Sequence, residues 1–328
     1  MTTAKTPAKT PTETIDIVGP EAEAHLDWIA LTDALAAGHA LPRAEVADTF
    51  LYRGADTLLT RSAWIDGLGL AIKGATVMPG NPDAGLPVVN GAVNLFSDRD
   101  GTLQAIVDFH LVTKWKTAGD SLLAARRLAR PDARRILILG AGNVARSMLE
   151  AYSAAFPGAR FEIWSRSAAS AERLAGSVAT GPGAGIAATA VTDLPAAVAR
   201  AEIIATTTMS SEPILRGDWL SPGTHLDLIG AYRPDMREVD DTALTRARIF
   251  VNSRATTIEH IGELKDPIAR GVIGAGDVIA DYYDLGSGRF ARGSEDEITL
   301  CKNGGGAHLD LMTADYILKA WRGRQGRP

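Results

Sequence analysis

A short apolar strand that leads directly into a glycine turn and a helix is the feature that most constrains the fold of this chain. Residues 136–139 are all apolar, and the pattern G-x-G-x-x-A follows from Gly140 through Gly142 to Ala145. In dinucleotide-binding folds the first glycine makes the tight turn, the second lets the backbone approach the pyrophosphate, and the small third residue lets the helix pack on the strand. The helix N-terminus then offers unpaired N–H groups and a positive dipole end. The segment predicts a dinucleotide site; a turn that binds no ligand is the alternative.

Strand-like and helical segments alternate after this turn, and that order predicts a doubly wound parallel sheet of the Rossmann type. The predicted strands cover residues 135–139, 160–164, 185–190, 202–207, 224–229 and 248–251. The predicted helices between them cover residues 144–155, 170–177, 194–201 and 236–247.

The region before the glycine turn consists of short strand-like runs separated by turn residues. These runs cover residues 48–53, 57–65, 68–77, 91–96 and 103–107, and they predict an antiparallel meander in a second domain of α+β type. A strand at 14–18, a helix at 21–40, a helix at 113–130 with Thr113 as a possible N-cap, and a last helix at 306–321 complete the prediction.

The composition argues against several classes of protein. A net charge of −5 over 328 residues gives no reason to expect nucleic acid or an anionic membrane as a partner. No apolar run approaches the ~18 residues that span a bilayer. The single cysteine, Cys301, excludes an intramolecular disulfide and fits a reducing cytoplasm. The six histidines lack metal-ligand spacing, so we expect no metal site.

The end of the second predicted Rossmann strand bears on the choice of cofactor. NAD-type sites usually place an acidic residue about 20 residues after the glycine turn, where it binds the ribose hydroxyls. This chain has Ser165 followed by Arg166 there. A hydroxyl and a guanidinium suit a 2′-phosphate, so NADPH is slightly favoured over NADH, and both stay open. A solvated arginine at a strand end is the alternative.

Polar loops follow two further Rossmann strands. Thr207, Thr208 and Met209 come after one strand, and Ile229 with Gly230 end the next. Ligands of such sheets bind outside the carboxyl ends of the strands, so these residues are expected to face the cofactor. Ordinary polar loops are the alternative.

Lys73 stands in a mostly apolar predicted strand of the first domain. A lysine in such a setting is costly unless it is paired or used in function. With Lys116, Arg53 and Arg61 it would supply enough positive charge to hold a substrate carboxylate. Each of the other three cations, taken alone, has a solvated surface charge as its alternative.

Several motifs occur together in the order typical of one family. They are Lys73 with the 79–82 and 85–87 segments, the 113–118 segment, Gly140 to Gly142, residues 223–230, 237–240, 261–264 and 302–307, and Asp310. With these motifs the chain resembles the ornithine cyclodeaminase/mu-crystallin family over nearly all of its length after residue 45. The resemblance implies an NAD(P) Rossmann domain and an antiparallel domain that typically forms a homodimer interface. It also implies a 2-amino or 2-imino carboxylate as ligand.

The resemblance also yields a domain division. Residues 1–116 together with 305–328 are expected to form the substrate-binding and dimerisation domain, and residues 117–304 the dinucleotide-binding domain. Residues 1–13 are polar and rich in Pro and Thr, so we expect them to be disordered.

Departures from the family pattern argue against ornithine cyclodeamination. Tyr232 stands where cyclodeaminases carry an aspartate, and Leu58 where they carry a glutamate. Lys116 replaces an arginine of the family, and it is a weaker partner for a carboxylate because it cannot bind both oxygens in one plane. The 230–238 segment is more similar to the imine-reductase branch. The carboxylate-binding arginine of the family would be Arg53, with Arg43 as the other candidate.

These observations predict an NAD(P)H-dependent reductase that converts a small 2-imino carboxylate to the L-amino acid. Pyrroline-2-carboxylate and iminosuccinate are both open as substrates. Lys73, Lys116 and either Arg53 or Arg61 would orient the carboxylate, and Lys73, Tyr232 and Asp310 are the candidates for the proton donor. The predicted cofactor-binding residues are Thr117, Gly140, Gly142, Asn143, Val144, Ser165, Arg166, Thr207, Thr208, Met209, Ile229, Gly230 and Gly305. An ornithine cyclodeaminase and a non-catalytic, NADPH-binding crystallin-like protein are the alternatives.

Overall fold

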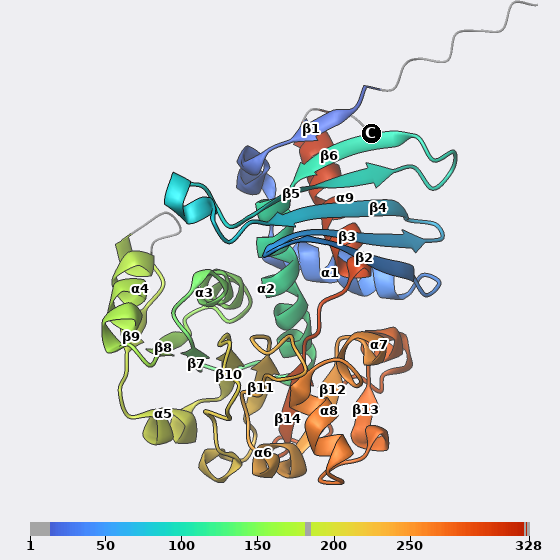
Figure 1. Cartoon of the computed structure of the whole chain (residues 1–328). Coiled ribbons are helices and arrows are strands. Elements are labelled where there is room, and N and C mark those ends of the chain that lie inside the picture. The colour runs from blue at the N-terminus through green and yellow to red at the C-terminus, as the bar shows by residue number, and fades with distance from the viewer. Residues whose placement is uncertain (1–13, 181–184, 325, 327–328) are drawn as a thin grey trace, which may run out of the picture.

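The computed structural model describes residues 14–180, 185–324 and 326, which contain two β-sheets and the helices that pack on them (Figure 1). The expected disorder of residues 1–13 lies outside the described residues.

A six-stranded sheet, sheet A, forms the first part of the fold, with its strands in the order β1-β6-β5-β4-β3-β2. The strands are β1 (Asp16–Val18), β2 (Glu45–Arg53), β3 (Asp56–Ile65), β4 (Gly69–Val77), β5 (Val89–Phe96) and β6 (Leu103–Asp108). Strands β2 to β6 form the predicted antiparallel meander, whereas β1 pairs in parallel with β6. Helices α2 (Phe109–Leu128) and α9 (Ala307–Arg324) pack against one face, and α1 (Trp28–His39) packs on both helices.

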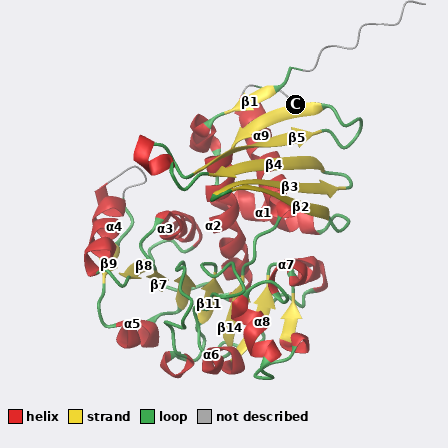
Figure 2. Ribbon diagram, in the orientation of Figure 1, coloured by secondary structure: helices red, strands yellow, loops and turns green. Residues whose placement is uncertain are grey.

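An eight-stranded, all-parallel sheet, sheet B, forms the second part, in the order β13-β12-β14-β11-β10-β7-β8-β9. Its strands are β7 (Arg135–Leu139), β8 (Arg160–Trp164), β9 (Ala188–Ala190), β10 (Ile203–Thr206), β11 (His225–Leu228), β12 (Ala247–Val251), β13 (Val278–Ala280) and β14 (Ile298–Lys302). Helices lie on both of its faces, among them α3 (Asn143–Ala155), α4 (Ala168–Thr180), α5 (Leu194–Arg200) and α6 (Asp241–Arg246) (Figure 2). The predicted doubly wound parallel sheet is confirmed.

Burial on both faces of sheet B explains the continuous apolar run of β7. Ile136 and Ile138 belong to the core that continues into α2, α3 and sheet A. Leu137 and Leu139 belong to a separate core on the opposite face, which includes side chains of α5 and α6. Because successive side chains of a strand point to opposite faces, both faces of this strand need apolar residues.

The strand prediction was incomplete, because it ended sheet B at residue 251. β14 lies inside the sheet between β12 and β11, and β13 forms one edge. β14 contains Thr299 and Lys302, both fully buried, so its sequence lacks the apolar run that marks a central strand. β13 has only three residues.

Three predicted helices have different bounds because aspartates cap them. The expected helix at 21–40 is divided into a 3₁₀ turn, η1 (Pro20–His25), and α1, whose N-cap Asp27 accepts a hydrogen bond from Ala30 N (2.8 Å). Helix α2 begins one turn early, at the N-cap Asp108, so the prediction of Thr113 as N-cap was wrong. Only α6 is helical within 236–247, because Asp240 caps it.

Candidate active site

The glycine turn connects β7 to α3 with the geometry that a dinucleotide needs. Gly140 has φ of +120°, and a Cβ there would lie 2.3 Å from Thr207 Oγ1, so only glycine fits. A Cβ on Gly142 would meet no atom within 4 Å, which leaves its backbone open to a ligand. No side chain caps α3, whose first residues are Asn143 and Val144. The residues therefore fit a pyrophosphate at this helix N-terminus.

The carboxyl ends of β7, β10 and β11 bring the other predicted cofactor loops beside this turn. Thr207 Oγ1 donates to Leu139 O (2.9 Å), which joins the loop after β10 to the end of β7. Gly230 N donates to Thr206 O (3.1 Å), which joins the loop after β11 to β10. Met209 is 73% exposed beside them.

A cavity of about 380 Å³ runs from the glycine turn towards sheet A. Asn143 and Val144 line its Rossmann side, and Thr113 and Thr117 of α2 line the other. Thr113 also accepts a hydrogen bond from Lys73 Nζ (3.0 Å). The predicted cofactor site and the surroundings of Lys73 are therefore adjacent.

Ser165 and Arg166 follow β8 at the same edge of sheet B, as expected. Ser165 Oγ accepts a hydrogen bond from Ser167 N (3.4 Å), and the side chain of Arg166 is exposed. Arg173 of α4 donates to Ser170 Oγ (2.8 Å) one turn further along. This edge therefore presents hydroxyls and guanidinium groups without a carboxylate between 165 and 171.

Lys73 is buried in an ion pair with Asp310, the residue that enters from α9. Lys73 Nζ lies 2.9 Å from Asp310 Oδ1 and 4.7 Å from the centre of the Phe109 ring. The two side chains are 9% and 2% exposed, so the charges are shielded from water. Asp310 Oδ2 has no hydrogen-bond partner among the described residues.

Burial sets the titration of this pair. Burial lowers the pKa of Lys73, assisted by the nearby Lys116 and Arg61, although Asp310 opposes the shift. Burial alone would raise the pKa of Asp310, but the combined charges of Lys73, Lys116 and Arg61 lower it below its usual range. Asp310 is thus an anion at neutral pH, and Lys73 is a stronger acid than a lysine in water.

Arg61 and Lys116 lie near Lys73, and the three residues are called the cation cluster below. Arg61 has an ion-pair partner and Lys116 has none among the described residues. Arg61 is the cross-strand neighbour of Lys73, so both side chains lie on the helix-covered face of sheet A. Asp48 neutralises Arg61 through two short contacts, 3.0 Å to Nε and 2.7 Å to an NH group. Lys116 makes no ion pair or hydrogen bond among the described residues, and its Nζ lies 3.1 Å from the Cβ position of Gly305.

Two other predicted residues lie apart from this cluster within the chain. Arg53 is paired with Asp56 at the tip of the β2–β3 hairpin, with 83% of its side chain exposed, on the opposite face of sheet A from Lys73. Tyr232 is 57% exposed, with the Arg233 guanidinium 5.8 Å from its ring centre. No hydrogen bond among the described residues joins either one to Lys73.

Two residues that contribute to the site were not predicted from the sequence. Thr113 was assigned to a cap, yet it is a helical residue that binds Lys73. Glu238 was noted only as part of a motif, yet its buried carboxylate binds both cofactor loops. Glu238 stands between Arg237 and Asp240 in a charged segment, so no local signal in the sequence marks it as buried.

The described residues contain no group of three His, Cys, Asp or Glu side chains that could hold a metal ion. No helix among residues 14–180 and 185–324 is long and apolar enough to cross a membrane.

The fold and the glycine turn define a dinucleotide-binding protein of the Rossmann class, in which the buried Lys73 of sheet A binds a threonine that lines the cavity beside the turn. Comparison with known proteins gives the family. The model of the ornithine cyclodeaminase/mu-crystallin family matches residues 64–325, and the chain belongs to that family.

Known relatives align over nearly the whole chain. A Delta(1)-pyrroline-2-carboxylate reductase of Paracoccus denitrificans is 51% identical over 305 residues, which is 92% of this chain and 96% of the relative. A solved archaeal alanine dehydrogenase dimer with bound NAD is 26% identical, with a TM-score of 0.83, and covers 95% of this chain and 97% of its own. The Delta(1)-pyrroline-2-carboxylate reductase of Thermococcus litoralis, solved with NADH and L-proline, has the same fold (TM-score 0.84, 23% identity, 95% and 99% covered).

Proposed function

We propose that this protein is an NAD(P)H-dependent reductase of a small 2-imino carboxylate, which it converts to the L-amino acid. One observation carries the proposal. Thr113 accepts a hydrogen bond from Lys73, which is buried in its ion pair with Asp310, and the same threonine lines the cavity beside the glycine turn. A carboxylate, a proton donor and a dinucleotide can therefore meet at one place. The 51% identity to a Delta(1)-pyrroline-2-carboxylate reductase supports the same reaction.

The charge balance of the cluster favours a monocarboxylate over a dicarboxylate. Asp310 is paired with Lys73 and Asp48 with Arg61, so Lys116 is the one of these three cations that has no ion pair among the described residues. One uncompensated positive charge matches one substrate carboxylate. We therefore favour pyrroline-2-carboxylate, or a cyclic imine of similar size, over iminosuccinate.

Each residue of the cluster has a separate task in this reaction. Lys116 binds the carboxylate as a point charge, and the missing side chain of Gly305 leaves room beside its ammonium group. Lys73 Nζ donates a proton to the imine nitrogen, which makes the adjacent carbon a better hydride acceptor. Asp310 and Thr113 accept two of the three N–H bonds of Lys73, so the third is directed at the substrate. A bound nicotinamide supplies the hydride.

We further propose NADPH as the preferred cofactor. The exposed Arg166 guanidinium and the Ser165 hydroxyl follow β8, where an NAD-specific site would carry an acidic residue. Arg173 adds a second guanidinium one turn into α4. These groups suit the charge and the acceptor oxygens of a 2′-phosphate.

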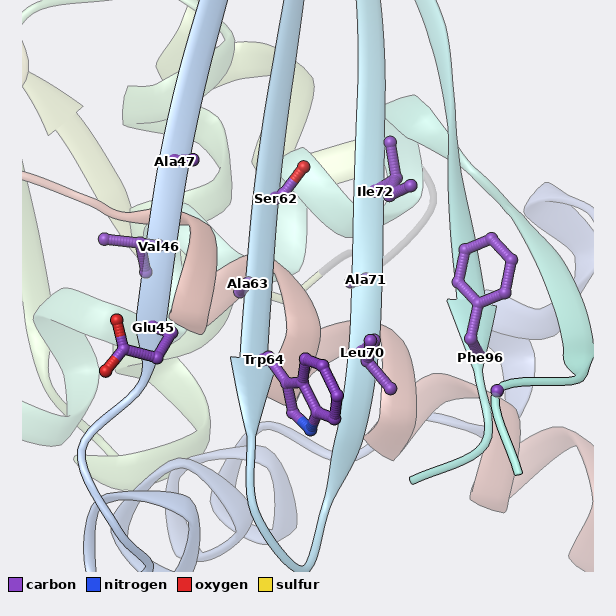
Figure 3. Close-up of a pocket in the computed structure, with 11 residues that line it drawn as sticks. Glu45, Val46, Ala47, Ser62, Ala63, Trp64, Leu70, Ala71, Ile72 and Phe96 are labelled. Atoms are coloured by element: carbon purple, nitrogen blue, oxygen red, sulfur yellow. The ribbon is translucent and has the colours of Figure 1, made fainter. Parts of the chain in front are cut away.

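We also propose that the protein is a homodimer formed through the outer face of sheet A. Trp64, Leu70 and Phe96 lie in cross-strand register on β3, β4 and β5, beside a groove of about 510 Å³ (Figure 3). Trp64 is 49% exposed, and Ile72 beside it is 37% exposed. An apolar surface of this kind is typical of a subunit interface, and the related alanine dehydrogenase is a dimer.

The domain division stays a proposal of the same kind. Residues 1–116 with 305–328 would form the substrate and dimerisation domain, and residues 117–304 the cofactor domain. The fully buried Cys301, the one cysteine of the chain, supports a cytoplasmic location.

The test is a spectrophotometric assay of NADPH and NADH oxidation with pyrroline-2-carboxylate, and with oxaloacetate plus ammonia as a source of iminosuccinate. We expect oxidation with the cyclic imine, faster with NADPH. If no imino acid oxidises either cofactor, the reductase proposal fails. Release of ammonia from ornithine would indicate a cyclodeaminase instead, and tight NADPH binding without turnover would indicate a binding protein.

A further inference from the structure

A single buried carboxylate, that of Glu238, binds the backbone of both loops that are expected to face the cofactor. One oxygen accepts hydrogen bonds from Thr208 N (2.8 Å) and Thr208 Oγ1 (2.7 Å), in the loop after β10. The other accepts from Gly230 N (2.8 Å) and Ala231 N (3.0 Å), in the loop after β11, and from Thr206 Oγ1 (2.8 Å). Glu238 is fully buried, and these five hydrogen bonds offset the cost of removing its charge from water.

Gly230 allows the two loops to meet at this carboxylate. A Cβ on Gly230 would lie 2.1 Å from Thr208 O and 2.4 Å from Glu238 Oε1. Any other residue would therefore push the loops apart or displace the carboxylate.

Two further buried charged residues interact with Glu238: Glu263 binds its backbone, and Lys302 is near enough for the two charges to interact. Glu263 of α8 (Gly262–Ala269) accepts hydrogen bonds from Glu238 N (2.8 Å) and Val239 N (3.0 Å). Lys302, at the end of β14, donates to Leu228 O (2.7 Å) and Asn303 O (3.0 Å). Both side chains are fully buried. Burial and the nearby Glu238 carboxylate raise the pKa of Glu263 to about 7.

We infer that Glu238 is a positioning residue of the cofactor site: it fixes the loops after β10 and β11 and so sets cofactor affinity without touching the cofactor. The inference rests on the proposed function, because it assumes that Thr208 and Gly230 face a bound nicotinamide dinucleotide. This role gives a purpose to two family motifs, residues 237–240 and 261–264, which contain Glu238 and its partner Glu263 and have no part in the proposed reaction.

Substitution of Glu238 separates this role from a purely structural one. E238Q keeps the shape of the side chain but removes the charge and presents an NH₂ group to backbone donors. We expect the Kd for NADPH, measured by nicotinamide fluorescence, to rise about 10- to 100-fold, the cost of misplacing a binding group by about 1 Å. The KM for the imino acid should change little, because Lys73 and Lys116 lie on other elements.

E202Q is the matched control. Glu202 also accepts two backbone hydrogen bonds, from Arg134 N (2.8 Å) and Arg135 N (2.9 Å), but at the amino-terminal edge of sheet B. It should lower the melting temperature without changing the Kd for NADPH.

T206V decides the question if E238Q does not fold. The Thr206 side chain is fully buried and donates to Glu238, so it cannot contact a cofactor. Its loss should still weaken NADPH binding several-fold. If E238Q folds and binds NADPH with the Kd of the wild type, the inference is overturned. If E238Q does not fold, an unchanged Kd for NADPH in T206V overturns it. A wild-type protein that binds neither NADPH nor NADH would defeat the proposed function as well, so the two failures are distinguishable.

Discussion

Lys73 and Asp310 are 237 positions apart in the sequence, yet Lys73 Nζ and Asp310 Oδ1 lie 2.9 Å apart in the core of the molecule. The lysine comes from β4 and the aspartate from the first turn of α9, so the ion pair joins the N-terminal sheet to the last helix. Neither charge has a low-energy position in that interior without the other.

Replacement of Lys73 should therefore affect both activity and folding. K73M leaves the Asp310 charge buried and unpaired, which should lower the free energy of unfolding by about 3–5 kcal/mol and reduce kcat at least about 100-fold. The double variant K73M/D310L removes both charges, so it should recover most of the stability and none of the activity. Urea unfolding and a steady-state assay measure the two effects. Activity in the double variant would show that Lys73 is not the proton donor.

The pH dependence of the reaction should report the titration of Lys73. Because burial lowers its pKa from the ordinary value of 10.5, the ammonium form is lost at a lower pH than in a typical lysine. As the donor must be protonated, kcat should fall as the pH rises through this lowered pKa. Measuring kcat between pH 6 and 10 tests this, and a rate that is flat up to pH 10 would contradict it.

Stability should also depend on pH through Asp120, a fully buried residue of α2. Burial raises the pKa of its carboxyl group from 3.8 to about 7. Between these values the unfolded chain releases a proton that the folded protein retains, so this group makes stability fall as the pH rises from 4 to 7. The slope is at most about 1.4 kcal/mol per pH unit. D120N cannot release a proton, so the decline between pH 5 and pH 7, measured by urea unfolding, should be shallower than in the wild type.

Cofactor preference should depend on Arg166. R166E places a carboxylate where the 2′-phosphate is expected, so the ratio of kcat/KM for NADPH to that for NADH should fall at least about tenfold, the usual effect of losing one charged hydrogen bond. R160E, at the opposite end of β8, is the control and should leave the ratio unchanged. Equal ratios in the two variants would place the 2′-phosphate elsewhere.

Charge on the outer face of sheet A should dissociate the proposed dimer. W64E and I72E each introduce a carboxylate into an apolar surface, and light scattering should then report a monomer at micromolar concentration. A196E serves as the control, because Ala196 is exposed on α5, away from sheet A. A dimer that persists in both W64E and I72E would exclude this face as the interface.

Local patterns in the sequence predicted much of the fold. The apolar run of β7 and the glycines after it predicted the dinucleotide turn, because a strand followed by a tight turn is encoded by residues that are adjacent in the sequence. β14 was missed because its buried Thr299 and Lys302 are stabilised by groups from other strands, such as Leu228 O. No local pattern contains that information.

The site was harder to predict for a related reason. Lys73 was recognised as a costly buried charge, and Asp310 was noted as a candidate proton donor rather than as its partner. The pairing of Arg61 with Asp48 depends on the strand register, since a shift by one residue would move either side chain to the other face of the sheet. For that reason the sequence left a dicarboxylate substrate open, and the charge balance emerged only from the structure.

Helix α2 has one further consequence for how the enzyme can work. Thr113, which binds Lys73, and Thr117, which lines the cavity beside the glycine turn, are one turn apart on this single helix. Four residues of α-helix span about 6 Å. A hinge motion between the two sheets would therefore leave this spacing unchanged. The contact residue of the proposed proton donor and the α2 residue of the proposed cofactor site therefore keep a fixed separation.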